Sequence, residues 1–160
     1  MVLRTIYLIT QDREASEELA QETFVRAYRK QHHFRGESSE RTWLYRVACN
    51  MAKNHLRRRP EQRGRGEIID FDRRATAHPG PEEVAARRES RARILSVVAE
   101  LPAELREVVA LYYLDEMSVT EVAEVVGIPA GTAKSRLARA RSELRRTLRE
   151  TDAVTGNAYE

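Results

Sequence analysis

Residues 118–149 constrain the fold of this chain more than any other stretch, because they combine a helix start, a glycine turn and a second, longer helix. Ser118 and Glu121 have the S-x-x-E spacing of a capping box, in which each side chain accepts a hydrogen bond from a backbone N–H at a helix start. Gly127 ends the short helix, where glycine takes a positive φ without steric cost. Pro129 suits the beginning of the next helix, because the N–H that proline lacks has no partner there. The segment predicts a helix-turn-helix.

Both helices of this segment are amphipathic, and their charges differ in sign. The apolar positions are Val119, Val122, Ala123 and Val126 in the first helix and Ala133, Leu137, Ala140, Leu144 and Leu148 in the second. Residues 100–131 hold seven acidic residues and one basic residue, whereas residues 132–149 hold seven basic residues and one acidic residue. This switch indicates that the second helix faces nucleic-acid phosphates, in the major groove of duplex DNA. A basic helix that is only exposed to solvent is the alternative.

Composition excludes several classes of protein. The chain has 160 residues and a net charge of only +3, so its basic character is local. It lacks a run of about 18 apolar residues that would insert in a membrane, and its first residues lack the cleavage site of a signal peptide. The lone Cys49 rules out an internal disulfide and, at a helical spacing among apolar residues, suits a buried thiol. These features predict a soluble, cytoplasmic protein.

No enzyme chemistry is evident in the sequence. The four histidines show no metal-ligand spacing with carboxylates, and no nucleophile is accompanied by an oriented base. We therefore expect no metal, no cofactor and no catalytic residues. An enzyme such as a nuclease is the hypothesis that the sequence supports least.

Helical periodicity recurs along the chain, and strand signals are nearly absent. Helices are predicted over residues 3–10, 13–32, 42–58, 81–100 and 103–114, followed by the helix-turn-helix. In the second of these, Ala20, Phe24, Ala27 and Tyr28 share one face. Residues 59–80 are rich in Pro, Gly and charge and poor in apolar side chains, which predicts a flexible linker. The expected fold is all-α, with two small helical domains at 1–58 (short at its N-terminus) and 81–150, and a loose tail at 151–160.

Two surfaces of the first domain carry unusual side-chain combinations. Aromatic residues alternate with cations and amides around the third helix, as Phe34, Arg41, Trp43, Tyr45, Arg46, Asn50, Lys53 and Asn54. Aromatic rings stack on unpaired bases and cations neutralise the backbone, so this pattern suits single-stranded nucleic acid; the alternative is that Trp43 and Tyr45 are ordinary core aromatics. The second helix gathers acidic residues (Glu14, Glu17, Glu18 and Glu22) around Gln21, which is either a docking face or a solvated surface.

Three stretches together carry a specific resemblance. SEELAQETFVRAYRK, FRGESSERTWLYRVACNMAKNHLRRR and LDEMSVTEVAEVVGIPAGTAKSRLARARSELRR are similar to segments of the extracytoplasmic-function group of bacterial RNA polymerase sigma factors, in the sigma-70 family. The similarity covers residues 3–58, as the family's second conserved region, and residues 81–149, as its fourth. The resemblance implies a subunit without enzymatic activity that binds core RNA polymerase and directs it to promoters.

The resemblance also assigns roles to individual residues. It implies that the acidic helix docks on a coiled-coil of the polymerase's largest subunit through Glu18, Gln21 and Glu22. Recognition and melting of the minus-ten promoter element, including single-stranded DNA, is implied for Phe34, Ser38, Ser39, Tyr45, Arg46, Asn50 and Lys53. Reading of the duplex minus-thirty-five element is implied for Thr132, Lys134, Ser135, Arg136 and Arg139. An anti-sigma factor is a further implied partner.

A second hypothesis of another class remains open. The chain could be a stand-alone helix-turn-helix transcriptional regulator, whose N-terminal helices serve dimerisation or sensing. Such a regulator would bind duplex DNA tightly without the polymerase and would have no affinity for the core enzyme.

Overall fold

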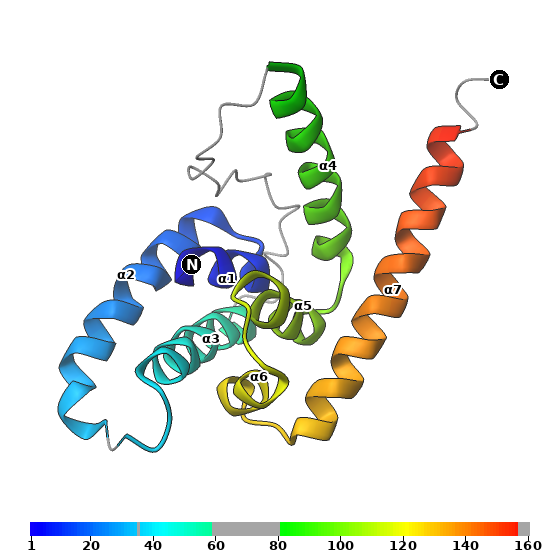
Figure 1. The fold of residues 1–160 in the computed structure, drawn as a ribbon. Coiled ribbons are helices and arrows are strands. Elements are labelled where there is room, and N and C mark those ends of the chain that lie inside the picture. Colours follow the sequence, from blue (N-terminus) through cyan, green and yellow to red (C-terminus); the bar gives the residue numbers. More distant parts are fainter. Residues whose placement is uncertain (35, 59–80, 157–160) are drawn as a thin grey trace.

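The computed structural model describes residues 1–34, 36–58 and 81–156, and every regular element within these ranges is helical (Figure 1). The elements are α1 (Val2–Thr10), α2 (Arg13–Lys30), a short 3-10 turn (Gln31–His33), α3 (Glu40–Arg58), α4 (Pro81–Glu100), α5 (Ala103–Val109), a π-helical turn (Ala110–Leu114), α6 (Val119–Val126) and α7 (Ala130–Gly156). The predicted all-α fold is confirmed. The linker predicted at 59–80 lies outside the described residues.

The first three helices form a mutually packed group. Gln11 ends α1 in the left-handed conformation (φ 59°), and Asp12 caps α2 by accepting a hydrogen bond from the N–H of Ala15 at 3.0 Å. The start of α3 is fixed by Ser39, whose hydroxyl oxygen accepts the N–H of Thr42 at 3.0 Å. These caps orient α2 and α3 so that both pack on α1.

The helix-turn-helix forms as the sequence predicts. Ser118 and Glu121 make both hydrogen bonds of the capping box, at 3.2 Å and 2.8 Å. Gly127 ends α6 with φ 77°. Val122 on α6 and Ala133 and Leu137 on α7 are buried, so each helix turns its apolar stripe to the core.

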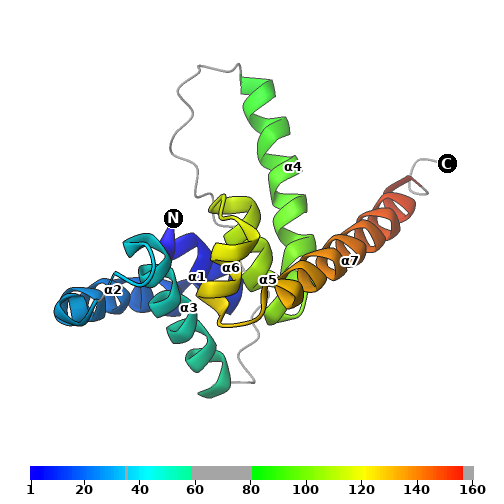
Figure 2. The ribbon, with the colours of Figure 1, turned by 60° about the horizontal axis from the view of Figure 1, so that its bottom comes forward.

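The two halves of the chain share one hydrophobic core. Ile6 and Ala48 from the N-terminal helices belong to the same buried cluster as Val108, Leu111 and Val122 from the C-terminal helices. Helix α6 packs against α3, and α5 packs against α1 (Figures 1 and 2). Each half is small and leaves an apolar face uncovered by its own helices, so mutual packing buries both faces. Periodicity reveals an apolar face but not the helix that covers it, and this contact was not predicted.

Two segments differ from expectation. Ala20 of the predicted face of α2 is buried, but Phe24 and Tyr28 are exposed, because α2 contacts its neighbours through a narrower stripe that includes Ala20 and Thr23. Tyr45 is only 2 % accessible, so it is a core aromatic, as the alternative interpretation expects. Helix α7 continues through residues 151–156, which were expected to belong to a loose tail, because no helix-breaking residue stands before Gly156.

None of the helices in the described ranges has both the length and the apolar character needed to cross a membrane.

Replacing Ser118 with alanine is expected to destabilise the protein by about 1 kcal/mol, because the hydroxyl that accepts the N–H of Glu121 at the start of α6 is lost. Urea unfolding followed by circular dichroism measures this change. Ser142→Ala on the exposed side of α7 is the matched control, and it should leave stability unchanged or slightly higher. Equal unfolding midpoints for the two variants would show that the cap contributes nothing.

Candidate nucleic-acid interface

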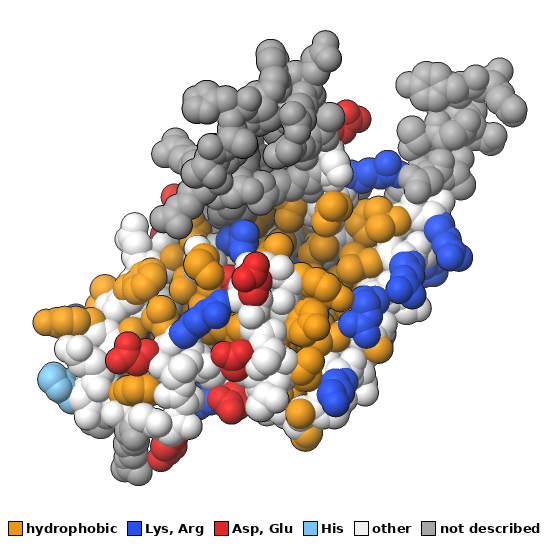
Figure 3. All heavy atoms as spheres, in the orientation of Figure 1, with side chains coloured by type: hydrophobic (Ala, Val, Ile, Leu, Met, Phe, Trp, Pro, Cys, Tyr) orange, Lys and Arg blue, Asp and Glu red, His pale blue; other side chains and the backbone are white. Residues whose placement is uncertain are grey.

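The first turns of α7 present a basic, exposed surface. Lys134, Ser135 and Arg139 are exposed, whereas Thr132 and Arg136 are partly buried. Ala133, Leu137 and Ala140 lie buried on the opposite side and fix the rotation of the helix about its axis. The structure therefore brings all five residues predicted for the minus-thirty-five element to one end of one helix. Figure 3 shows Lys and Arg side chains continuing along the edge formed by α7.

Two arginines of this surface share one carboxylate from α5. Glu104 lies 3.6 Å from Arg136 and 3.9 Å from Arg139, and Arg139 also pairs with Glu143 at 2.9 Å. Ion pairs that remain accessible to solvent contribute little to stability. Glu104 thus holds both guanidinium groups near the start of α7. The sequence pattern gave no signal for this role, because it arises from the packing of α5 on α7.

The residues predicted for the minus-ten element are divided between an open side and a covered side. Phe34 packs against Trp43 with ring centroids 5.5 Å apart, at the end of α3 where the loop enters. Ser38 is partly buried in that loop, and Ser39 caps the helix. Asn50 is exposed on α3. These four predicted residues (Phe34, Ser38, Ser39 and Asn50) are not engaged by the C-terminal half in any of the described contacts.

The other three predicted side chains contact the C-terminal half. Tyr45 donates its phenol hydrogen to Asp115 Oδ1 at 2.7 Å, and Arg46 Nε donates to the carbonyl oxygen of Glu124 at 3.2 Å. Lys53 Nζ lies 3.1 Å from Glu107 Oε1. Burial, followed by the hydrogen bond to Asp115, raises the pKa of Tyr45, so its hydroxyl remains a donor. The structure does not gather the seven residues on one open surface.

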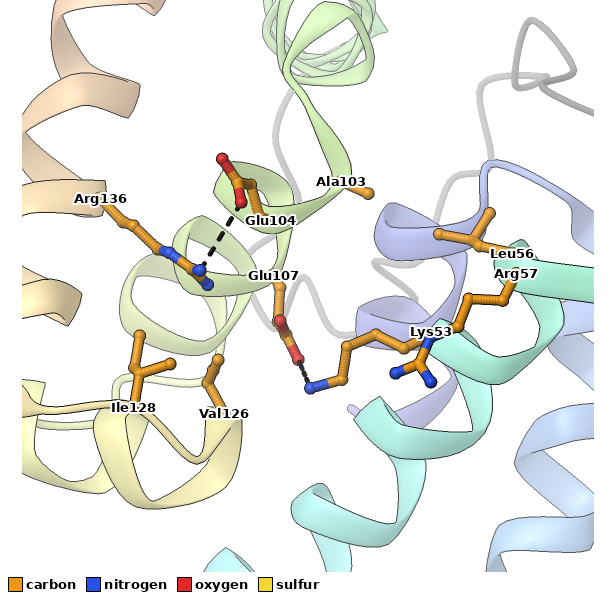
Figure 4. A pocket seen from close by; sticks show the side chains of 9 residues that line it. All are labelled: Lys53, Leu56, Arg57, Ala103, Glu104, Glu107, Val126, Ile128 and Arg136. Atoms are coloured by element: carbon orange, nitrogen blue, oxygen red, sulfur yellow. Dashed lines mark ion pairs between the residues drawn. The ribbon is translucent and has the colours of Figure 1, made fainter. Parts of the chain in front are cut away.

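A cleft of about 370 Å³ lies where α3 meets the C-terminal helices (Figure 4). Four of its polar side chains form two ion pairs, Lys53 with Glu107 and Arg136 with Glu104. Burial raises the pKa of Glu107, although Lys53 opposes this shift. The residues that the structure describes contain no group of three or more His, Cys, Asp or Glu side chains able to hold a metal ion. The cleft is therefore a polar junction between the two halves.

The acidic face of α2 is open to solvent. Glu18, Gln21 and Glu22 are exposed, and Glu22 pairs within its own helix with Arg26 at 2.6 Å. Three exposed apolar side chains on the same helix, which were not predicted to belong to this surface, are Phe24 (54 % exposed), Val25 (48 %) and Tyr28 (74 %). Exposed apolar side chains gathered next to polar ones mark protein-binding surfaces. The signal was present in the sequence, but these residues could equally have faced the core.

Comparison with protein families gives two matches in chain order. The family model described as sigma-70 region 2 matches residues 1–61, and the model described as sigma-70, region 4 matches residues 91–144.

Curated relatives cover most of the chain. The RNA polymerase sigma-H factor of Pseudomonas aeruginosa is 35 % identical over 154 residues, which span 92 % of this chain and 80 % of that protein. The ECF RNA polymerase sigma-E factor of Escherichia coli K12 is 35 % identical over 79 % of this chain and 70 % of its own length. The ECF RNA polymerase sigma factor SigW of Bacillus subtilis is 32 % identical over 84 % of this chain and 76 % of its own length.

Solved structures share the fold. The sigma factor RpoE of Bartonella quintana, in complex with the anti-sigma factor NepR, superimposes with a TM-score of 0.69 at 22 % identity, over 92 % of this chain and 89 % of that one. CnrH, in complex with the cytosolic domain of CnrY, gives a TM-score of 0.66 at 24 % identity, over 93 % and 80 % of the two chains.

Proposed function

The chain belongs to the extracytoplasmic-function group of sigma-70 RNA polymerase sigma factors, and we propose that it binds core RNA polymerase and directs transcription initiation at promoters that its own residues recognise. The observation that carries this proposal is the combination, in one chain, of an exposed acidic and apolar face on α2 with a basic helix-turn-helix. A stand-alone regulator needs only the second of these surfaces.

The start of α7 is proposed to read the minus-thirty-five element in the major groove. Arg136 and Arg139 have the fork of donors that binds guanine O6 and N7, and Lys134 is placed to neutralise phosphate. Ser135 donates its hydroxyl hydrogen to the carbonyl oxygen of Gly131 at 3.0 Å, so its oxygen remains free to accept a further hydrogen bond. Thr132, one turn nearer the helix start, is proposed to contact the backbone.

The loop and α3 are proposed to recognise and melt the minus-ten element. Phe34 and Trp43 supply an aromatic surface at the loop, and Asn50 supplies an exposed amide on the helix. Stacking of an unpaired base on such a surface is worth about 1–3 kcal/mol, which favours a strand that is already open. Ser38 and Ser39 in the loop, together with Tyr45, Arg46 and Lys53, complete the proposed set.

The exposed face of α2 is proposed to dock on the clamp coiled-coil of the largest polymerase subunit. Glu18, Gln21 and Glu22 provide polar contacts, and the adjacent Phe24 and Tyr28 add apolar area at the centre of the contact. Anchors of this kind carry most of the binding energy in protein interfaces.

Further parts of the proposal concern partners, chemistry and location. An anti-sigma factor is proposed as the inhibitory partner, because the sigma factor RpoE, whose fold this chain shares, is bound to the anti-sigma factor NepR. The chain is proposed to have no catalytic activity of its own. Because core polymerase acts on the chromosome, the chain is proposed to function in the bacterial cytoplasm, at the nucleoid.

Gel filtration of the purified chain with core RNA polymerase tests the proposed function against the stand-alone regulator. We expect the chain to co-elute with the core enzyme, and the mixture to protect promoter fragments that the chain alone does not protect. A chain that remains separate from the core enzyme, while it binds specific duplex DNA unaided, would establish the regulator instead.

A further inference from the structure

Helix α3, whose role in reading the minus-ten element is part of the proposed function, is covered on one face by acceptor groups of the C-terminal half. Tyr45, Arg46 and Lys53 each contact such a group, from Asp115, Glu124 and Glu107 respectively. The side chain of Arg41 also donates to the backbone carbonyl oxygen of Asp115. These acceptor groups therefore occupy side-chain donors that phosphates and base edges would otherwise bind.

Asp115 is the centre of this contact. Its side chain is fully buried, and it accepts hydrogen bonds from the hydroxyl of Thr5 on α1 and the phenol of Tyr45 on α3. The guanidinium of Arg4 lies 3.8 Å from the same carboxylate. A buried carboxylate is tolerated only where several donors satisfy it. Both N-terminal helices that face the C-terminal half are thus joined to it through one side chain.

This arrangement is incompatible with simultaneous reading of the two promoter elements. The elements are centred about 25 base pairs apart, which is about 85 Å of duplex at 3.4 Å per base pair. In the structure α6 of the helix-turn-helix packs directly on α3. The halves must separate before α3 and α7 can reach both elements.

We propose that Asp115 latches an autoinhibited closed state, in which the C-terminal half covers the promoter-melting helix until polymerase or DNA binding favours separation. Closure buries apolar side chains of both halves in one cluster, so the free chain rests in the closed state. A ligand that binds only the open state has an apparent Kd equal to its intrinsic Kd divided by the fraction of open molecules, so closure weakens its binding.

Cys49 is a native reporter of this separation. It is the only cysteine of the chain, its side chain is fully buried on α3, and Glu107 of α5 lies against its thiol. Burial raises the pKa of the Cys49 thiol, which further slows its reaction in the closed state. When the halves separate, α5 leaves the thiol and a soluble disulfide reagent such as DTNB can react.

The test compares the rate of DTNB reaction at Cys49 in the wild type, Asp115→Asn and Thr5→Val. Asp115→Asn keeps the shape of the side chain but removes its charge, and we expect a reaction about 10- to 100-fold faster, as loss of charge-assisted hydrogen bonds predicts. Thr5→Val removes a single donor and should give a smaller acceleration. Glu116→Gln, which removes the charge of the exposed neighbouring carboxylate, is the control and should match the wild type. An unchanged rate in Asp115→Asn would overturn the latch.

Urea dependence separates opening from unfolding. We expect the Cys49 reaction to depend on urea much less steeply than global unfolding followed by circular dichroism, because separation of two folded halves exposes less surface. Reaction rates that follow global unfolding in slope and in the size of the Asp115→Asn effect would contradict the proposal, since Asp115 would then only stabilise the fold.

Transcription with core polymerase tests the regulatory consequence. At limiting concentrations, Asp115→Asn should give more promoter-specific transcript than the wild type, and the difference should vanish at saturation. Equal transcription at all concentrations, despite faster labelling, would refute autoinhibition. Absence of transcription from both proteins, with the labelling difference kept, would contradict the sigma-factor function and support the latch alone.

Discussion

The double variant Lys134→Ala, Arg139→Ala is expected to lose about 100-fold in promoter-specific transcription, while its affinity for core polymerase stays unchanged. A bidentate contact between arginine and guanine discriminates by about 1–3 kcal/mol, and each phosphate contact adds to the affinity for any sequence. Both side chains are exposed, and Ala133 and Leu137 hold the helix from its other side. The fold should therefore survive the change.

Run-off transcription and gel filtration with core polymerase measure these two properties separately. Arg146→Ala is the matched control, because Arg146 is an exposed arginine of the same helix that pairs only weakly with Glu150 at 3.4 Å and lies far from the helix start. It should keep promoter preference and lose at most a little general affinity for DNA. An equal loss of core affinity in the double variant would contradict the division of labour between α2 and α7.

The double variant Gln21→Ala, Glu22→Ala is expected to bind core polymerase about 10- to 30-fold more weakly. Loss of polar contacts next to the apolar anchors Phe24 and Tyr28 is expected to cost about 1.4–2 kcal/mol, which is this fold-change. The intrahelical pair of Glu22 with Arg26 is half exposed on both sides, so its loss should change folding stability little. A fluorescence anisotropy titration of the labelled chain with core polymerase measures the change.

Glu17→Ala provides a charge-matched comparison for this variant. Glu17 is on the same helix, is 57 % exposed and pairs with Arg13 at 3.3 Å, and its loss should leave polymerase affinity within about twofold of the wild type, as expected for a rim contact. If the Gln21 and Glu22 variant bound core polymerase as tightly as Glu17→Ala, the proposed docking face on α2 would be wrong.

The helices were predictable because local rules determine them. The capping box at Ser118 and the glycine turn at Gly127 depend only on nearby backbone, and both formed as expected. Residues on the stripe of α7 faced the core for the same reason, since a three- and four-residue spacing allows one buried face. The prediction that Cys49 is buried is likewise confirmed.

The contact between the halves could not be predicted, because it depends on tertiary packing. In the sequence Asp115 is an ordinary acidic residue before a turn, and nothing nearby indicates that Thr5 and Tyr45 will donate to it. Tyr45 and Phe24 also show that the sequence alone does not determine which aromatic side chains are buried. One aromatic beside cations proved buried, and one at an apolar spacing proved exposed, because the covering helix decides the outcome.

The burial of Glu107 has a consequence for the closed state at different pH values. Desolvation raises the pKa of this carboxyl above its ordinary value. When the pKa of a carboxyl is higher in the folded state than in the unfolded state, protonation of that carboxyl stabilises the folded state. The stabilisation by Glu107 is therefore present at low pH and is lost as the pH rises through its pKa in the folded protein. The ammonium group of Lys53 lies 3.1 Å from the Glu107 carboxylate and offsets part of the cost of burying that charge at neutral pH.

Run-off transcription with purified core RNA polymerase on genomic fragments is the decisive experiment for the proposed sigma-factor function. We expect discrete transcripts that need both the core enzyme and this chain, and that start downstream of a minus-thirty-five and a minus-ten element. Core polymerase that yields no promoter-dependent transcript with the chain on any fragment, while it responds to another sigma factor, would contradict it.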